Sequence, residues 1–398
     1  MDIGQIKTLR AAYRDELFES VIPFWLNHSL DRECGGYFAC LDRDGTVFDT
    51  DKFAWMQGRE IFTFLKLCSV YGTQPEWLEA AQLGLDFMRA HGRAANGDFY
   101  FSLDRAGNPL VAPYNIFSDC FMCTALSEYH KVTGEERARE EAVALYRRIQ
   151  VRKDNPKGIW TKQIPGARNL CAMALPMIQM MMARELAGVL PESELAPVIE
   201  ENLEIIRRRH IDHDLKMMFE RVLPDGGHMF SVMEGRLLNP GHALEVLWFM
   251  MDVANGMGRQ DIVEEAGEVM LWCIERGWDE KYGGIFYYMD YENRPTEKLE
   301  SAMKLWWVHA EALCAFLLAY KLLGRKEHLD WFLRLSDYSF SHFSDREYGE
   351  WYGYLTREGE PAFTLKGGKW KGFYHLPRML LTCEQWLGEM ENELLLRD

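Results

Sequence analysis

Two histidines of the sequence lie in settings that could support acid–base chemistry. His242 occurs in Asn239-Pro240-Gly241-His242-Ala243-Leu244-Glu245, where Pro240 and Gly241 mark the start of a helix. Glu245 follows three residues later and shares a helical face with His242. A carboxylate at this spacing could fix the imidazole tautomer and raise its basicity, as a general base requires. The alternative is a histidine at a helix start that its own glutamate caps for structural reasons.

His375 occurs in a second segment of unusual composition, Lys366 to Arg378. Three glycines, three lysines and Trp370 precede the histidine there, which is uncommon for a plain helix start. The sequence Lys366-Gly367-Gly368-Lys369 does not match the P-loop that binds phosphate. The segment is therefore either a surface loop or part of a binding site around the indole of Trp370 and the imidazole of His375.

A third segment, Lys304 to Ala312, combines aromatic rings with an acid. Trp307 and Glu311 are four residues apart in a helical pattern, so an indole and a carboxylate can contact one ligand, with Trp306 beside them. His309 lies two residues from Glu311 and should point elsewhere, so we interpret it as structural.

Arg59 and Asp119 are further candidates in the opening turns of expected helices. Arg59 is either a partner for Glu60 or another acid at the surface, or a fixed cation that stabilises a developing oxyanion in a cavity. Asp119 is a candidate for contact with the substrate.

The histidines and cysteines give no recognised metal pattern. His210 and His213 lie in a run of arginines and aspartates that indicates a solvated helix end. Cys120 and Cys123 have the C-x-x-C form, but they fall in a helical pattern in which both thiols face the core. Neither an H-E-x-x-H motif nor a paired C-x-x-C motif occurs, so we expect chemistry without a metal.

The elements that must position these residues follow an internal repeat. Clusters of glycines, aromatics and charges recur six times, about every 60 residues, which is typical of one supersecondary unit used repeatedly. Each interval holds two segments with helical periodicity and one short turn or strand-like piece. The glycines that mark the six clusters are Gly36, Gly97, Gly158, Gly227, Gly284 and Gly349.

Six helix pairs favour a closed ring over an open solenoid. An open array needs polar capping repeats, whereas the first and last units here resemble the middle ones. We therefore predict an all-α (α/α)6 barrel, or toroid, of about twelve helices with short β-hairpin-like connections. Its inner helices are expected to begin near residues 52, 115, 169, 241, 302 and 371, so that their opening turns converge on one cavity. A cavity lined by aromatics and a few polar groups suits a sugar.

Length and composition narrow the classes of protein further. The 398 residues contain no linker or low-complexity stretch, so residues 1–398 are expected to form a single domain. The net charge of −16 argues against binding to nucleic acid. The N-terminus lacks the layout of a signal peptide, and the most apolar run, Cys171 to Ala183, is shorter than the roughly 20 residues that span a membrane. Nine cysteines without framework spacing indicate a cytoplasmic location.

Five of these segments together resemble the N-acylglucosamine 2-epimerase family. The similarity spans most of the chain in the same order. The family resemblance implies an (α/α)6 barrel that interconverts N-acyl-D-glucosamine and N-acyl-D-mannosamine and commonly forms a homodimer. The segments that carry the resemblance are 51–59, 116–121, 239–245, 304–312 and 369–378.

The resemblance also implies roles for individual residues. By motif position, His242 and His375 match the acid/base pair of the family, and Arg59 and Glu311 match other residues that its activity requires. Related sugar epimerases keep groups near the substrate at the positions of Glu245, Trp307 and Trp370. We expect Trp306 and Asp119 to bind the substrate as well.

The chemistry of a 2-epimerase follows from the acidity of the carbon that it inverts. In the open-chain sugar the C2 proton lies next to an aldehyde, so its removal gives an enediolate with charge on O1. One histidine would take the proton and the other would return one to the opposite face. Arg59 would stabilise the oxyanion, and Glu311 would orient a histidine or the sugar. No cofactor is needed for this chemistry, although ATP is an unconsumed activator in some family members.

Several alternatives stay open at this point. Disaccharide-specific relatives have a further histidine on the helix that corresponds to Asn169 onward, and residues 169–177 contain none, which favours an N-acyl sugar or a simple monosaccharide. A mannose/glucose-type 2-epimerase or an aldose–ketose isomerase would use the same enediolate. A glycosidase would instead need two cavity carboxylates. A non-catalytic role in binding another protein, known for a mammalian family member, is the alternative of another class.

Overall fold

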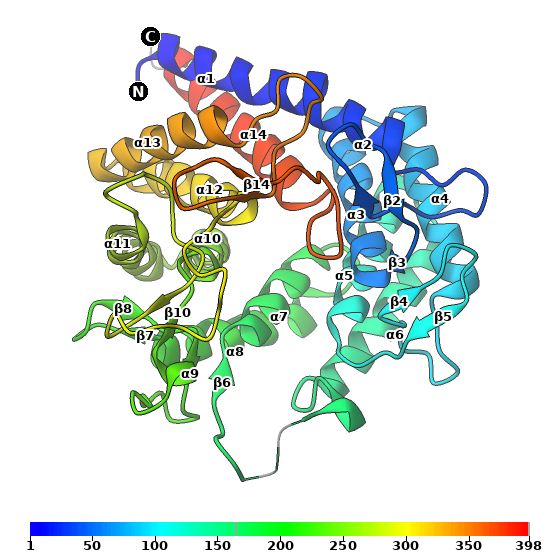
Figure 1. The fold of residues 1–398 in the computed structure, drawn as a ribbon, viewed down its shortest axis with the longest axis horizontal. Coiled ribbons are helices and arrows are strands. Elements are labelled where there is room, and N and C mark those ends of the chain that lie inside the picture. The colour runs from blue at the N-terminus through cyan, green and yellow to red at the C-terminus, as the bar shows by residue number, and fades with distance from the viewer. Residues whose placement is uncertain (163, 165, 397–398) are drawn as a thin grey trace.

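The protein alternates between an outer and an inner helix along most of its length (Figure 1). A computed structural model describes residues 1–162, 164 and 166–396. The outer layer begins with α1 (Ile3–Asp15), which continues through a π-helical segment (Glu16–Val21) into α2 (Ile22–His28). The other outer helices are α4 (Pro75–His91), α6 (Glu136–Arg152), α8 (Glu192–Ile205), α11 (Gln260–Gly277) and α13 (Lys326–His342).

Six inner helices form the ring that the repeat predicts. Each contacts the next in chain order, and the last contacts the first, so the ring is closed. The predicted (α/α)6 barrel is confirmed. Figure 1 shows α1 and α14, from opposite ends of the chain, lying side by side. The inner helices are α3 (Ala54–Tyr71), α5 (Phe117–Thr133), α7 (Ala174–Glu185), α10 (Pro240–Gly256), α12 (Trp306–Leu323) and α14 (His375–Leu395).

The apolar character of the inner helices explains why they are inside. α12 has apolar residues on all sides, as expected of a helix that packs against both the outer layer and its inner neighbours. α12 is also long and apolar enough to cross a membrane, but 78% of its apolar window is buried in the barrel. α11 and α13 carry polar residues on one face, so they cover the ring and meet solvent.

In four places along the described chain, a short antiparallel strand pair ties one connection to the next. The strand before an inner helix pairs with a strand of the following connection, which holds the helix starts at one end of the barrel. These pairs are β3 (Lys52–Phe53) with β4 (Ser102–Leu103), β6 (Cys171–Ala172) with β9 (Arg221–Val222), β10 (Leu237–Leu238) with β11 (Met289–Asp290), and β12 (Lys304–Leu305) with β13 (Tyr354–Leu355).

The remaining strands complete hairpins within single connections. A single helical turn, α9 (Met233–Arg236), precedes β10. The strands are β1 (Cys40–Leu41) with β2 (Val47–Asp49), β5 (Pro109–Val111) with β4, β7 (Ile211–Asp212) with β8 (Met217–Met218), and β14 (Pro361–Phe363) with β13.

An ion triad with a buried aspartate and a buried lysine recurs in three of the connections. Asp279, which follows an outer helix, accepts from Lys304 Nζ at 3.1 Å and from Arg357 Nε at 2.8 Å. The lysine comes from the strand before the inner helix, and the arginine comes from the next unit. Hydrogen bonds from Arg357 and Lys304 hold the pKa of Asp279 below its usual range, although burial alone would raise it. The other two triads are Asp31–Lys52–Arg105 and Asp345–Lys366–Arg43.

The third triad joins the two ends of the ring. Arg43 belongs to the first unit and Asp345 to the last, and Arg43 Nε lies 2.7 Å from Asp345 Oδ2. The contact that links neighbouring units inside the array therefore also closes it.

Replacing Asp279 should destabilise the fold because it leaves Lys304, which is fully buried, without its counterion. We expect Asp279→Ala to lower the free energy of unfolding by about 3–5 kcal/mol. Urea unfolding followed by circular dichroism measures the change. Asp330→Ala is the control, since the exposed Lys326–Asp330 pair should be worth less than about 1 kcal/mol. Equal effects of the two substitutions would show that the triad adds no stability.

Candidate active site

A cavity of about 800 Å³ opens where the inner helices begin. All six inner helices contribute to its wall, so residues far apart in the chain become neighbours. A second cavity of about 720 Å³ lies between the start of the chain and the loop after α13, and it contains none of the predicted site residues. Of the predicted residues, those that line the first cavity are Arg59, His242, Glu245, Trp306, Trp307, Trp370 and His375.

His242 lies in the first turn of α10 with a carboxylate behind its ring. Asn239 caps the helix by accepting from the backbone N–H of His242 at 3.1 Å. His242 Nδ1 lies 3.1 Å from Glu220 Oε2, in the turn between β8 and β9. An Nδ1–H that donates to this carboxylate leaves Nε2 for chemistry. Burial alone would lower the pKa of His242, but the charge of Glu220 and its hydrogen bond raise it above the usual value.

The expectation that Glu245 holds the imidazole of His242 is wrong, because Glu220 does so. Glu245 lies one turn further into the barrel, where Arg378 Nη2 donates to its Oε1 at 2.8 Å. Sequence offered no signal for Glu220, which lies in a connection outside every motif. Arg378 could have been found, since it follows His375 by three residues.

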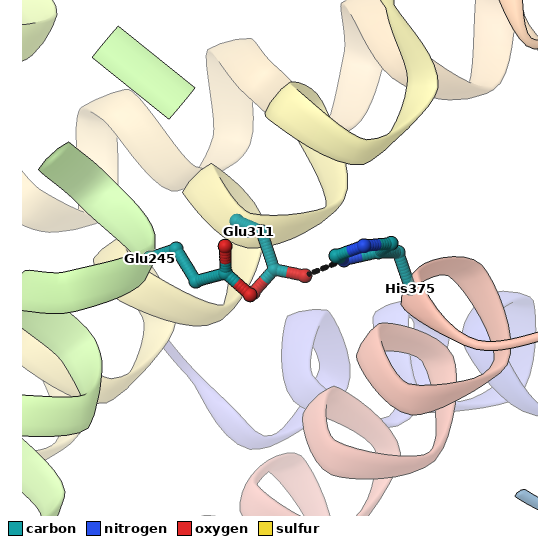
Figure 2. Close-up of side chains that lie close together, drawn as sticks. All are labelled: Glu245, Glu311 and His375. Atoms are coloured by element: carbon teal, nitrogen blue, oxygen red, sulfur yellow. Dashed lines mark hydrogen bonds and ion pairs between the residues drawn. The ribbon is translucent and has the colours of Figure 1, made fainter. Parts of the chain in front are cut away.

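His375 is the first residue of α14, and its ring is held by Glu311. Figure 2 shows its Nδ1 directed at Glu311, with Oε1 at 2.6 Å. The Glu311 side chain is fully buried behind the cavity wall, and its other oxygen accepts from Trp248 Nε1 at 2.9 Å. Burial lowers the pKa of His375 well below its usual value, and the charges of Arg59 and Arg378 lower it further.

Glu245, Glu311 and His375 converge from three inner helices on one point (Figure 2). Each offers an atom within 4.8 Å of the others, which is the geometry of a group that could hold a cation. Arg378 supplies that cation, because its Nη2 donates to Glu245 and, at 2.5 Å, to Glu311. Its Nη1 donates to the hydroxyl of Tyr374 at 3.0 Å.

Arg59 lies in α3 and projects among aromatic rings. Its guanidinium carbon is 4.5 Å from the ring centroid of Trp55, 4.1 Å from that of Phe121 and 4.7 Å from that of Tyr374. Its Nε has no hydrogen-bond partner in the described part of the chain. Burial lowers the pKa of Arg59 to about 10, so the group stays charged at neutral pH. The alternative pairing with Glu60 is wrong, since Glu60 accepts from Ser29 instead.

The indole of Trp307 contacts both imidazoles. Its ring centroid lies 5.2 Å from that of His242 and 5.8 Å from that of His375. Trp306 borders His375 at 6.5 Å, and Trp370 lies at the rim, more than half exposed, with its edge against Trp55. The structure therefore brings both histidines to one aromatic surface in the same cavity.

Asp119 does not belong to the cavity, which corrects the prediction that it contacts the substrate. Its carboxylate accepts from the backbone N–H of Phe99 and from Arg152 Nη1, both at 3.1 Å, and so fixes a connection behind the wall. The structural interpretation of His309 is confirmed, because its Nε2 accepts from the backbone N–H of Ile285. The predicted solvated end around His210 is wrong for that residue, which is fully buried.

A family model and curated relatives identify the family of the chain, and solved structures share its fold. The N-acylglucosamine 2-epimerase (GlcNAc 2-epimerase) family model matches residues 36–378. The chain is 38% identical to the N-acylglucosamine 2-epimerase of Bos taurus over 98% of this chain and 94% of that protein. It is 24% identical to the cellobiose 2-epimerase of Bacteroides fragilis over 96% and 99%. The structure of cellobiose 2-epimerase from Bacillus thermoamylovorans B4167 has the same fold, with a TM-score of 0.82, 23% identity, and coverage of 95% of this chain and 99% of that chain. The protein thus belongs to the N-acylglucosamine 2-epimerase family.

Proposed function

We propose that the protein interconverts N-acyl-D-glucosamine and N-acyl-D-mannosamine by inverting C2. The observation that carries this proposal is the pair of imidazoles on one indole, each with its Nδ1 beside a carboxylate. In both histidines this arrangement leaves Nε2 as the atom that can exchange a proton with a ligand.

The reaction needs one proton removed and one returned. After the sugar ring opens, the Nε2 of one imidazole takes the C2 proton, and the C–H electron pair becomes the enediolate. The Nε2–H of the other imidazole then protonates the opposite face of C2. Arg59, whose Nε has no hydrogen-bond partner among the described residues, stabilises the charge that develops on O1. Carbon is neither oxidised nor reduced, so the chemistry requires no redox cofactor.

The wall formed by α7 supports an N-acyl sugar as the substrate. Its residues that face the cavity are Ala174, Met177, Ile178 and Met181, which are all apolar. An apolar wall can cover the methyl group of an acyl chain. Each buried CH₂-sized group contributes roughly 0.8 kcal/mol to the free energy of binding. A plain hydroxyl at C2 would gain nothing from it. The higher identity to an N-acylglucosamine 2-epimerase than to a cellobiose 2-epimerase favours the same substrate class.

The three carboxylates that a glycosidase could recruit near the histidines are engaged elsewhere. Glu245 and Glu311 are both bound by Arg378, Glu311 also holds His375, and Asp119 faces away from the cavity. A non-catalytic role in protein binding would leave the paired histidines without a purpose. Activation by ATP, a homodimer and a cytoplasmic location stay predictions from the family resemblance and the cysteine content. No P-loop occurs in the sequence.

Incubation with N-acetylmannosamine in D₂O tests the reaction. We expect N-acetylglucosamine that carries deuterium at C2, because the returned proton comes from an imidazole that exchanges with solvent. NMR of the product reports its position. Parallel incubations with mannose and cellobiose, each with and without ATP, test the substrate class and nucleotide activation. A ketose product would favour the isomerase alternative.

Each histidine should be indispensable to turnover. We expect His242→Ala and His375→Ala to lower kcat by about 10²–10⁴-fold, since each removes one general acid or base. A coupled assay of N-acetylmannosamine consumption measures the loss, and circular dichroism checks that the helices are retained. A variant that keeps near-native kcat would remove its histidine from the mechanism.

Arg59 should act mainly on the transition state. We expect Arg59→Met, which keeps much of the apolar contact with Trp55 and Phe121, to lower kcat by about 10²–10³-fold. KM should change much less, because the charge on O1 develops only after proton removal. A change confined to KM would show that the guanidinium binds the ground-state sugar instead.

A further inference from the structure

We propose that Glu220 is a positioning residue that keeps His242 protonated in the resting enzyme, while His375 rests neutral and serves as the first base. This inference rests on the proposed epimerase function and assigns a state to each of its two histidines. It follows from the different charges that surround two otherwise similar imidazoles.

The surroundings of His242 are negative. Glu220 lies at its Nδ1 and forms no ion pair with a lysine or arginine in the described chain, so its charge is left to the imidazole. Glu245 from the same helix and Glu311 from α12 add negative potential, and His375 faces it from α14. Tyr287 and Tyr288 approach Glu220 as neutral phenols, because burial raises the pKa of both.

The surroundings of His375 are positive in spite of its own carboxylate. Glu311 is shared with Arg378 and with the indole N–H of Trp248, so its charge is already offset. Arg59 approaches from α3, and Glu245, whose charge favours a proton on His375, is itself bound by Arg378. A proton on His375 would therefore join two buried guanidinium groups, whereas a proton on His242 is paired with an unshared acid.

This difference gives the catalytic cycle a starting point. From the resting state, His375 Nε2 takes the C2 proton, and His242 Nε2–H gives its proton to the opposite face of the enediolate. The cycle ends with the proton on His375 and with His242 neutral. Exchange of protons with solvent restores the resting state. The epimer whose C2–H faces His375 reacts with the resting enzyme directly. The other epimer reacts only with the less stable state, in which His242 is neutral and His375 is protonated.

Glu220→Gln in the full-length protein tests the proposal. The amide oxygen can still accept from Nδ1–H, but the charge is lost. In the native protein without substrate, ¹³C-labelled histidine signals should show His242 protonated and His375 neutral at neutral pH. The variant should show His242 neutral there. A native protein with His242 neutral or His375 protonated would overturn the proposal.

The pH profile provides the second measurement. Activity in the starting direction requires His242 protonated, so it falls as pH rises through the pKa of His242. Because that pKa is lower in Glu220→Gln, this alkaline limb should move to lower pH. At mildly alkaline pH, kcat should fall about 10-fold or more while KM changes less than about twofold, and activity should recover at lower pH. A limb that does not move would contradict the proposal.

A neighbouring acid provides the matched control. Glu234 pairs with Arg221 next to the same connection and touches neither histidine. Glu234→Gln should leave the histidine signals and the pH profile unchanged, and a shift equal to that of Glu220→Gln would count against a specific role for Glu220. Since the histidine titration needs no substrate, it can fail while epimerisation is observed, or hold while no epimer forms. The two proposals are therefore tested separately.

Discussion

The guanidinium of Arg378 is the contact on which the site depends. Three inner helices bring Glu245, Glu311 and His375 to one point, where two carboxylates would otherwise repel each other in a poorly solvated interior. Arg378 donates to both carboxylates, and burial does not release its proton because those acids raise its pKa well above the usual value. Because Arg378 offsets the charge of Glu311, this carboxylate can orient the ring of His375 without making the surroundings of His375 negative. Packing of three helices and the state of one imidazole thus rest on a single side chain.

The sequence carried enough information to predict the ring. Glycine and aromatic clusters mark each connection, and helices that are apolar on all sides can only be inside. The first residues of the inner helices were predicted less accurately. The helix expected to begin near residue 169 begins at Ala174. Cys171 and Ala172 form β6 instead, and its pairing with β9 depends on a connection about 50 residues away, which no local pattern reveals.

The types of residue at the site were predictable, but several of their partners were not. Helix starts converge in a toroid, so placing His242, His375 and Arg59 in one cavity required only the ring. The direction in which each side chain points within a helical turn is harder to predict from the sequence. Ser118 and Phe121 line the cavity, whereas Asp119, turned about 100° from Ser118, meets Arg152 behind the wall. Glu220 reaches His242 from an irregular connection, where neither the helical nor the strand period constrains direction.

The triad of Arg43, Asp345 and Lys366 forms the junction at which the first and last units of the ring meet. Its arginine and aspartate are 302 positions apart, so this contact has the longest separation in sequence of the three triads and closes the longest loop of chain. Beside it, Lys371 donates to Glu350, and four residues further on the backbone reaches His375. A transient opening of this junction would displace the imidazole of His375 while most helices stay packed. Catalytic activity can therefore be lost by local unfolding well below the temperature at which the barrel melts.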